Sequence, residues 1–145
     1  MDIAIIQGRI NAIAFMQRTG VKVLEVRRGY GRVVMPLAGN ENHINSLYIG
    51  AFSVLAEAGS VIPASSFLDA EKYYPVVKKM DLDFIKPACS DVYATYELSG
   101  EQITALEAGL EAQGKAEYIA DLPLTDEDGQ VVARARATIK LLSHR

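Results

Sequence analysis

The chain has 145 residues, of which half are hydrophobic and 23% are charged, with a formal net charge of -3. This size predicts one domain, residues 1–145, because it suffices for one buried core but not for two ordinary domains. The slight acidity argues against nucleic acid as a partner. The single cysteine, Cys89, excludes an internal disulfide or a cysteine metal cluster within the chain.

Long apolar runs are also missing from the sequence. None approaches the roughly 20 residues that span a bilayer, so we expect no membrane partner, and the lone cysteine fits a reducing, cytoplasmic location. Residues 1–19 predict one amphipathic helix instead, because apolar residues recur at helical spacing from Ile3 to Met16 and Gly20 follows as a stop signal.

The rest of the chain alternates between strand and helix patterns. Residues 21–26 and 32–37 predict two strands joined by a glycine-rich turn, and a long, almost uncharged helix is expected at about residues 46–62, with Pro63 at its end. Residues 73–85 and 91–98 predict two more strands.

The C-terminal part begins with a helix signal. Ser99 and Gln102 have the spacing of a capping box, and Gly114 closes the helix that they open. Residues 115–124 and 131–142 then form two strands around an acidic turn. Because most strand connections are hairpin-like, the fold class is predicted to be α+β with a mainly antiparallel sheet.

The long central helix carries one acid, Glu57, on an otherwise apolar surface. A helical wheel places it with Gly50, Ser53 and Ser60 in a sector of roughly 80°. A buried carboxylate has a raised pKa, which suits a general base or nucleophile near neutral pH. The first-turn amides, around Leu47 to Gly50, lack intrahelical acceptors and could bind an oxyanion.

A structural role for Glu57 is the alternative. The carboxylate would then reach solvent at the rim of the helix, or pair with an arginine such as Arg134 or Arg136. The spacing in the sequence leaves both interpretations open.

Three short motifs resemble the hotdog-fold thioesterases. In the subgroup similar to the acyl-CoA thioesterases of phenylacetate degradation, an Asn precedes His-Gly-Gly at a helix start, and Leu-Ala-Asp or Leu-Ala-Glu follows. Here Asn42 precedes Tyr48-Ile49-Gly50, and Leu55-Ala56-Glu57 follows at matching spacing. The resemblance implies a curved antiparallel sheet that wraps a long central helix. Tyr in place of His resembles a less-studied, thioesterase-like branch.

The resemblance also implies roles for individual residues. Glu57 would be the catalytic carboxylate, the amides of Ile49 and Gly50 would bind the oxyanion, and Asn42 would orient the carbonyl or the loop. Other residues are expected to contact the substrate: Tyr48, Ser53, Ser60, Arg134 and Arg136. The two arginines could meet the phosphates of coenzyme A, and a solvated face of the sheet would explain them equally well.

The function that follows is hydrolysis of an acyl thioester, with acyl-CoA or an acyl carrier protein as the partner and no metal or cofactor. The acyl group is expected in a tunnel lined by Phe52, Met80, Phe84 and Tyr96. The resemblance further implies a homodimer or homotetramer with its sites at the interface between copies.

Two other functions stay open. A non-catalytic protein that binds acyl-CoA or a lipophilic ligand is suggested by Tyr48 in the place of His. A hotdog dehydratase would need a histidine beside the acid, and neither His43, in a polar loop, nor His144, in the terminal tail, is expected there. We expect Cys89 to be a passive thiol.

Overall fold

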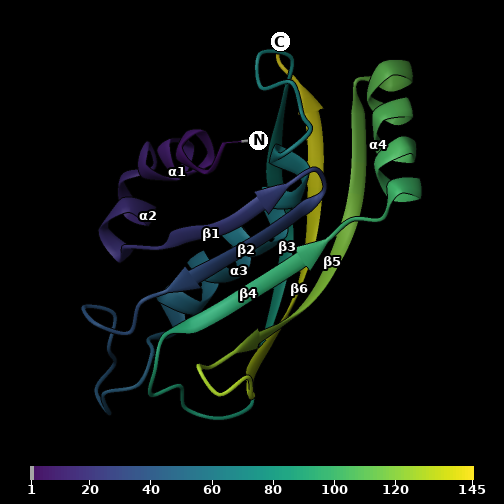
Figure 1. Ribbon diagram of the computed structural model, residues 1–145. Helices are drawn as coiled ribbons and strands as arrows, with labels where there is room; N and C mark the ends of the chain where they lie inside the picture. Colours follow the sequence, from purple (N-terminus) through teal and green to yellow (C-terminus); the bar gives the residue numbers. More distant parts are fainter. Residues whose placement is uncertain (1) are drawn as a thin grey trace.

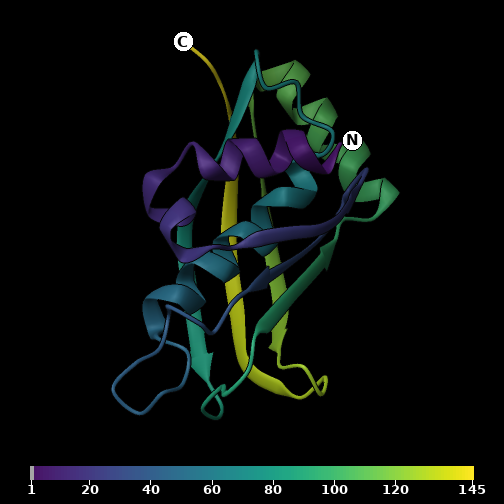
Figure 2. The same cartoon turned by 60° about the vertical axis from the view of Figure 1, so that its left-hand side comes forward.

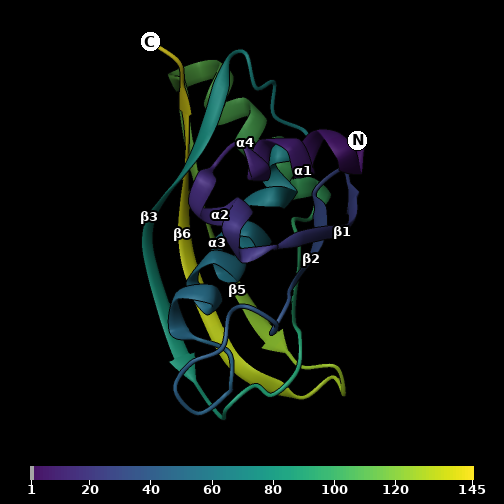
Figure 3. The same cartoon turned by 90° about the vertical axis from the view of Figure 1, so that its left-hand side faces the viewer.

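A computed structural model describes residues 2–145 and shows one curved antiparallel sheet with the strand order β1-β2-β4-β5-β6-β3 (Figure 1). The strands are β1 (Lys22–Arg27), β2 (Tyr30–Met35), β3 (Tyr73–Phe84), β4 (Val92–Glu97), β5 (Lys115–Thr125) and β6 (Val131–Ser143). The helices are α1 (Ile3–Asn11), α2 (Ala14–Thr19), α3 (Ile49–Ser65) and α4 (Gly100–Gln113). Viewed as in Figure 3, α3 lies between the β3–β6 and β1–β2 ends of the sheet. This is the hotdog fold that the sequence predicted.

Close contact between α3 and the sheet depends on two glycines. A Cβ atom on Gly59 would lie 2.8 Å from the Cβ of Ala94 in β4, and one on Gly31 in β2 would lie 2.6 Å from Cγ2 of Ile62. Ordinary carbon contacts are about 3.5–4.0 Å. The helix can therefore sit this close to the sheet only because both positions lack a side chain.

The ends of α3 differ from the prediction by about one turn. Its first residue is Ile49 rather than 46, because the amides of Leu47 and Tyr48 donate to the carbonyls of Ala88 and Asn40 and hold the chain extended there. At the other end the helix continues beyond Pro63 to Ser65.

Two side chains support the helix around Pro63, whose nitrogen cannot donate a hydrogen bond. The hydroxyl of Ser66 donates to the carbonyl of Pro63 at 2.6 Å and accepts the amide of Gly29 at 2.7 Å. The hydroxyl of Tyr118 donates to the carbonyl of Ser60 at 2.5 Å. The β1–β2 turn and β5 are thus tied to the last two turns of α3.

The N-terminal segment forms two short helices, so the prediction of a single helix over 1–19 is wrong for the residues that the structure describes; Met1 lies outside them. The backbone of Ile13 is extended, with φ -91° and ψ 104°, which separates α1 from α2. The bend allows Ile6, Ile10 and Met16 to be buried together, while Ile13 stays half exposed. Figure 2 shows both helices on the open side of the curved sheet, beside α3.

The two edge strands of the sheet differ in what lies beside their outer sides. The side-chain amide of Gln7 in α1 pairs with β1 like a short strand: its oxygen accepts the amide of Val23 at 2.8 Å, and its nitrogen donates to the carbonyl of Val21 at 3.0 Å. The other edge strand, β3, pairs with β6 on its inner side and has no strand on its outer side within residues 2–145. The apolar side chains that alternate along β3, such as Met80 and Leu82, are only half covered, and Phe84 is 50% exposed.

The remaining helix, α4, follows the prediction closely. Ser99 and Gln102 make both hydrogen bonds of the capping box, and Gly114 ends the helix with a left-handed φ of 69°. Ile103, Leu106 and Leu110 are its buried residues, and it packs mainly along β5. In the part of the chain described by the structure, no helix has both the length and the apolar character to cross a bilayer.

Candidate active site

Glu57 lies in the middle of α3 and is half-buried in the wall of an apolar cavity. Burial raises the pKa of this carboxyl above its ordinary value of 4.5, because the ionised form loses hydration there. Between residues 2 and 145 no cation lies within ion-pair distance of it. The geometry therefore gives a carboxylate that takes a proton more readily than an exposed one and is not neutralised by a neighbour.

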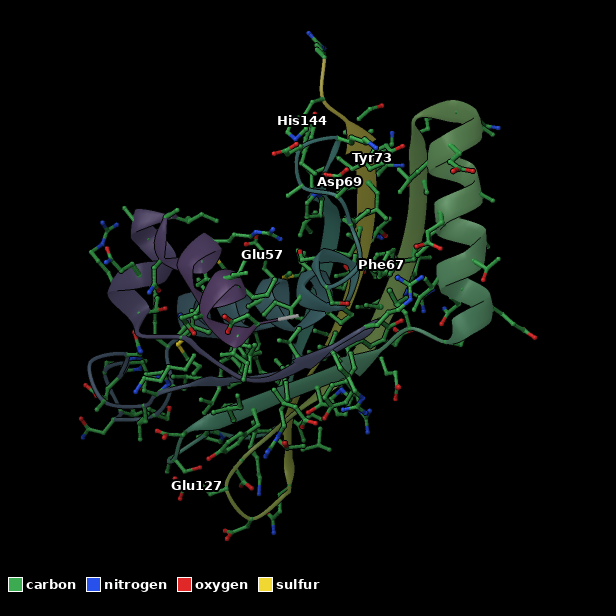
Figure 4. The ribbon with its side chains drawn as sticks, turned by 45° about the horizontal axis from the view of Figure 1, so that its top comes forward. Glu57, Phe67, Asp69, Tyr73, Glu127 and His144 are labelled. Carbon is green, nitrogen blue, oxygen red and sulfur yellow. The ribbon has the colours of Figure 1, made fainter. Side chains whose placement is uncertain are left out.

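The cavity has a volume of about 300 Å³ and is formed by segments far apart in the sequence. Its walls come from α1 and α2, the face of α3 that bears Glu57, the segment after α3, the start of β3, and His144. Figure 4 shows Glu57 beside the N-terminal helices, with Tyr73 and His144 further away. Most of the lining is aliphatic or aromatic, so the cavity suits an apolar group.

The start of α3 offers two backbone donors. The amides of Ile49 and Gly50 have no acceptor within hydrogen-bond distance among residues 2–145, whereas those of Leu47 and Tyr48 do. The expected donor segment, Leu47 to Gly50, is thus reduced to its last two residues. Ile49 is 57% exposed, so a ligand can approach these amides from solvent.

Tyr48, the last residue before α3, lies over Gly50. A Cβ atom on Gly50 would lie only 2.9 Å from Cε1 of the Tyr48 ring. The absent side chain therefore leaves room for this ring at the helix start, and the ring is itself 53% exposed.

Asn42 organises the loop before α3. Its side-chain oxygen accepts the amides of Ile44 and Ser46, both at 3.0 Å, and its nitrogen donates to the Ser46 hydroxyl at 2.9 Å. These hydrogen bonds are consistent with the expectation that Asn42 orients the loop. A contact with a substrate carbonyl stays a prediction.

The two serines expected beside Glu57 bind backbone carbonyls. The hydroxyl of Ser53 donates to the carbonyl of Gly50 at 2.7 Å. That of Ser60 donates to the carbonyls of Ala56 and Glu57, at 2.7 and 3.1 Å, and Ser60 is fully buried. Neither serine lines the cavity, and Ser60 in particular faces the protein interior, away from any approaching ligand.

Arg134 and Arg136 lie on the outer face of β6. The residues that alternate with them, such as Ala135, are buried against the core, so the arginines point away from α3. Arg136 instead pairs with Asp121 of β5, with 3.6 Å between Nη1 and Oδ2. A pair between either arginine and Glu57 is therefore excluded. Both remain exposed on a face that does not border the cavity.

The expected tunnel residues are not brought together. Phe52 and Phe84 are in edge-on contact, with ring centroids 5.3 Å apart, whereas Tyr96 stacks on Tyr118 at 6.4 Å. None of these residues, nor Met80, lines the cavity beside Glu57. A tunnel formed by these residues therefore stays a prediction, and it is separate from the cavity beside Glu57.

Two cavity residues were missed by the sequence reasoning. Arg9 of α1 lines it, and so does His144, whose Nε2 lies 3.1 Å from the carbonyl oxygen of Ala70. The ring of His144 also packs on Tyr74, with centroids 5.0 Å apart. The helical period from Ile3 to Met16 could have pointed to α1 as a wall, but no local signal marks a histidine in the terminal tail.

A comparison with protein-family models assigns the chain to a family. The model of a domain of unknown function, DUF4442, matches residues 5–141. The chain belongs to this family. No match is found among curated proteins.

Solved structures similar to this DUF4442 chain include proteins named as thioesterases. A Pseudomonas aeruginosa protein called a protein of unknown function and probable thioesterase is 41% identical, with a TM-score of 0.89 over 99% of this chain and 97% of that one. A mutant of another P. aeruginosa thioesterase is 17% identical, with a TM-score of 0.78 over 99% of this chain and 96% of that one. At that lower identity the likeness shows the fold alone.

Proposed function

We propose that this DUF4442 chain hydrolyses acyl thioesters, with Glu57 as the reacting carboxylate. The observation that carries the proposal is a half-buried acid with no ion-pair partner among residues 2–145, in the wall of an apolar cavity, with its pKa raised by burial. The name of the 41% identical relative supports the same reaction class. Acyl-CoA and acyl carrier proteins both present such a thioester, and the reaction needs no metal or cofactor.

The chemistry assigns one task to Glu57 and another to the start of α3. Glu57 removes a proton from water, whose oxygen attacks the thioester carbonyl, or the carboxylate attacks the carbonyl itself. Negative charge then develops on the carbonyl oxygen, where the amides of Ile49 and Gly50 would stabilise it. If water attacks, the carbon–sulfur bond breaks, the thiol leaves with the proton that Glu57 took up, and a carboxylic acid remains. If the carboxylate attacks, the thiolate leaves and an acyl–Glu57 anhydride forms; water then hydrolyses the anhydride to the carboxylic acid and the free carboxylate, and the proton released goes to the thiolate.

One copy of the chain does not bring these two parts together. Glu57 follows Ile49 by eight residues, which corresponds to about 12 Å along a helix that rises 1.5 Å per residue. A carboxylate side chain cannot bridge this distance to a carbonyl held at its own helix start. We therefore expect Glu57 of one copy to work with the amides of another, in a homodimer or a homotetramer built from dimers.

The open edge of β3 supports such a dimer. Lys78 and Lys79 precede Asp81 and Asp83 along this strand, so two copies paired antiparallel about a twofold axis would place lysines opposite aspartates. The capped edge of β1 offers no comparable surface. Phe84 and the half-covered face of β3 would be buried in the same contact.

Thiol release from a panel of acyl-CoAs tests the reaction. Glu57→Gln is expected to lower kcat by at least about 100-fold, the usual minimum for a catalytic acid or base. Wild-type activity that survives this substitution unchanged, or no activity on any thioester, would refute the proposal.

The two-copy arrangement has a sharper test in Ile49→Pro. Proline fits the first helical position, and Tyr48 before it already has the extended backbone that a following proline requires (φ -69°, ψ 144°). The substitution removes only the Ile49 amide, with an expected loss of about 10²–10³ in kcat, whereas Ile49→Ala keeps the amide and serves as the control.

Mixing the two inactive variants tests whether both parts belong to one site. If Glu57→Gln and Ile49→Pro chains exchange partners, the mixed dimers contain one intact site, and about a quarter of the wild-type activity returns. Activity that stays absent after demonstrated subunit exchange would show that each site is built within one copy.

Acyl-CoA binding without hydrolysis is the second candidate. The observation that favours it is the Tyr48 ring beside the free amide of Gly50, at the position where the thioesterase subgroup that the sequence resembles has histidine. Calorimetric binding of acyl-CoA with no thiol release would establish this function instead. Tyr48→His would then be expected to introduce turnover.

A further inference from the structure

The cavity beside Glu57 extends in one direction along α3. Its floor on the helix includes Glu57, Val61 and Ser65, spaced four residues apart on one face. The eight residues from Glu57 to Ser65 correspond to about 12 Å of helix. This direction runs toward the C-terminal end of α3, away from the amides of Ile49 and Gly50.

Two aromatic rings narrow the far end of the cavity. The chain continues from Ser65 into the segment that contains Ala70 and Tyr74, and His144 packs against both. Figure 4 shows Tyr73 and His144 at this end, separated from Glu57. A ligand whose reacting group lies at Glu57 and which follows the helix therefore reaches Ser65 after about 12 Å, and these rings line the cavity beyond that point.

Between the two ends most of the walls are apolar, although Arg9 of α1 also lines the cavity. Ile6, Ile10 and Met16 line one side, and Val61 lies on the floor. The hydroxyl of Ser65 is already bonded to the carbonyl of Val61, at 3.3 Å. A ligand in this stretch would find few polar partners, which favours a hydrocarbon chain.

Two size estimates agree on the length of that chain. A volume of about 300 Å³ holds about ten groups the size of a water molecule, at roughly 30 Å³ each, and a methylene is of similar size. A fully extended chain of single bonds advances about 1.2 Å per bond, since an extended residue spans roughly 3.6 Å in three bonds. A distance of 12 Å thus also corresponds to about ten bonds.

On the basis of the proposed function, we propose that the acyl substrate is an unbranched medium chain of about eight to ten carbons. It lies along the C-terminal half of α3, with its carbonyl at Glu57 and its end at Ser65, Tyr74 and His144. Ser65 is the residue that sets the length limit. A phenylacetyl group would leave the far half of the cavity unfilled.

The test compares the hydrolysis of butyryl-, decanoyl-, hexadecanoyl- and phenylacetyl-CoA. Each buried methylene is worth about fourfold in transition-state binding. We expect kcat/KM to rise at least about 50-fold from butyryl to decanoyl, which needs full burial of only about three methylenes. It should then fall for hexadecanoyl, whose end finds no room beyond the rings.

A substitution at the far end of the cavity tests specifically whether this end limits the chain length. Ser65→Leu places bulk two turns from Glu57 and is expected to lower the decanoyl-to-butyryl ratio of kcat/KM by at least about tenfold. Thr104→Leu, on the exposed face of α4, is the control and should leave the ratio unchanged. Thermal unfolding of both variants checks that they are folded.

The outcomes separate this proposal from the one on function. A flat length profile, an optimum at phenylacetyl or sixteen carbons, or a ratio that Ser65→Leu does not change overturns the medium-chain assignment while hydrolysis stands. If no thioester is hydrolysed, the proposed function fails, and calorimetry on the wild type still tests the cavity. Decanoyl-CoA binding at least about 50-fold tighter than butyryl-CoA, and weakened by Ser65→Leu, supports the assignment; equal affinities refute it.

Discussion

The contact between α3 and the sheet at Gly59 predicts that Gly59→Ala destabilises the protein. The added Cβ atom would lie 2.8 Å from Cβ of Ala94 and 3.1 Å from Cδ1 of Leu122, against an ordinary contact of about 3.5–4.0 Å. Both neighbours are buried, and Ala94 belongs to a central strand, so the helix itself must shift.

The expected change in the free energy of unfolding follows from two opposing effects. Overpacking of this kind costs about 1–3 kcal/mol, and alanine gains up to about 1 kcal/mol over glycine in a helix interior. A net loss of about 0–2 kcal/mol, centred near 1 kcal/mol, should remain, and each kcal/mol lowers Tm by about 4 °C for a chain of this length. Gly8→Ala is the matched control: nothing lies within 4 Å of its Cβ position on α1, so only the helical gain applies.

Denaturant titration at one fixed protein concentration measures the effect, because association would otherwise contribute to stability. The midpoint should move in opposite directions for Gly59→Ala and Gly8→Ala. Adding Ala94→Gly to Gly59→Ala removes one clashing atom, so the double variant should be more stable than the sum of the single changes by at least about 0.5 kcal/mol. If both alanine substitutions stabilise the protein alike, the close contact assigned to Gly59 is wrong.

Three further substitutions have defined outcomes. Burial raises the pKa of Glu57 above 4.5, so the contribution of Glu57 to the stability of the fold is fully present below that pH and is lost as the pH rises through the folded-state pKa. Glu57→Gln should flatten this fall in a series of thermal unfolding curves, and the variant should gain stability relative to the wild type toward pH 7. Tyr118→Phe removes the donor to the Ser60 carbonyl and should cost about 0.5–1.5 kcal/mol by denaturant titration, so an unchanged midpoint would contradict this bond. Gln7→Ala leaves the β1 edge without its partner and should cost about 1–3 kcal/mol and speed amide exchange in β1, whereas Gln17→Ala, on the exposed side of α2, should do neither.

Local chemistry determined much of the secondary structure in advance. Ser99, Gln102 and Gly114 bound α4 as predicted, because capping bonds and a left-handed glycine involve only neighbouring residues. The alternation along β6 likewise puts Ala135 and Arg136 on opposite faces of the sheet, because successive side chains of a strand point to opposite sides. Where the backbone of a neighbouring segment competes, as at Tyr48 before α3, the sequence placed the boundary about one turn too early.

The acid of α3 was found by the same local reasoning, but its neighbours were not. The wheel singled out Glu57 because a lone carboxylate is unusual on an apolar helix. The helical wheel also grouped Ser60 with Glu57. The sector of roughly 80° spans both positions, yet Glu57 is half-buried and Ser60 is fully buried. Only the packing of β5 against α3 decides which part of that sector faces the interior.

The cavity is the feature that only the tertiary structure decided. It joins α1 and α2 to α3, to the start of β3 and to the C-terminal tail. His144 reaches it because β6 pairs with β3 and the His144 amide donates to the carbonyl of Lys72 at 2.9 Å. Strand order is a property of long-range pairing, and no local pattern in the sequence encodes that β6 lies next to β3. The sequence by itself therefore determined which residue could react, and the order of the strands decided what surrounds it.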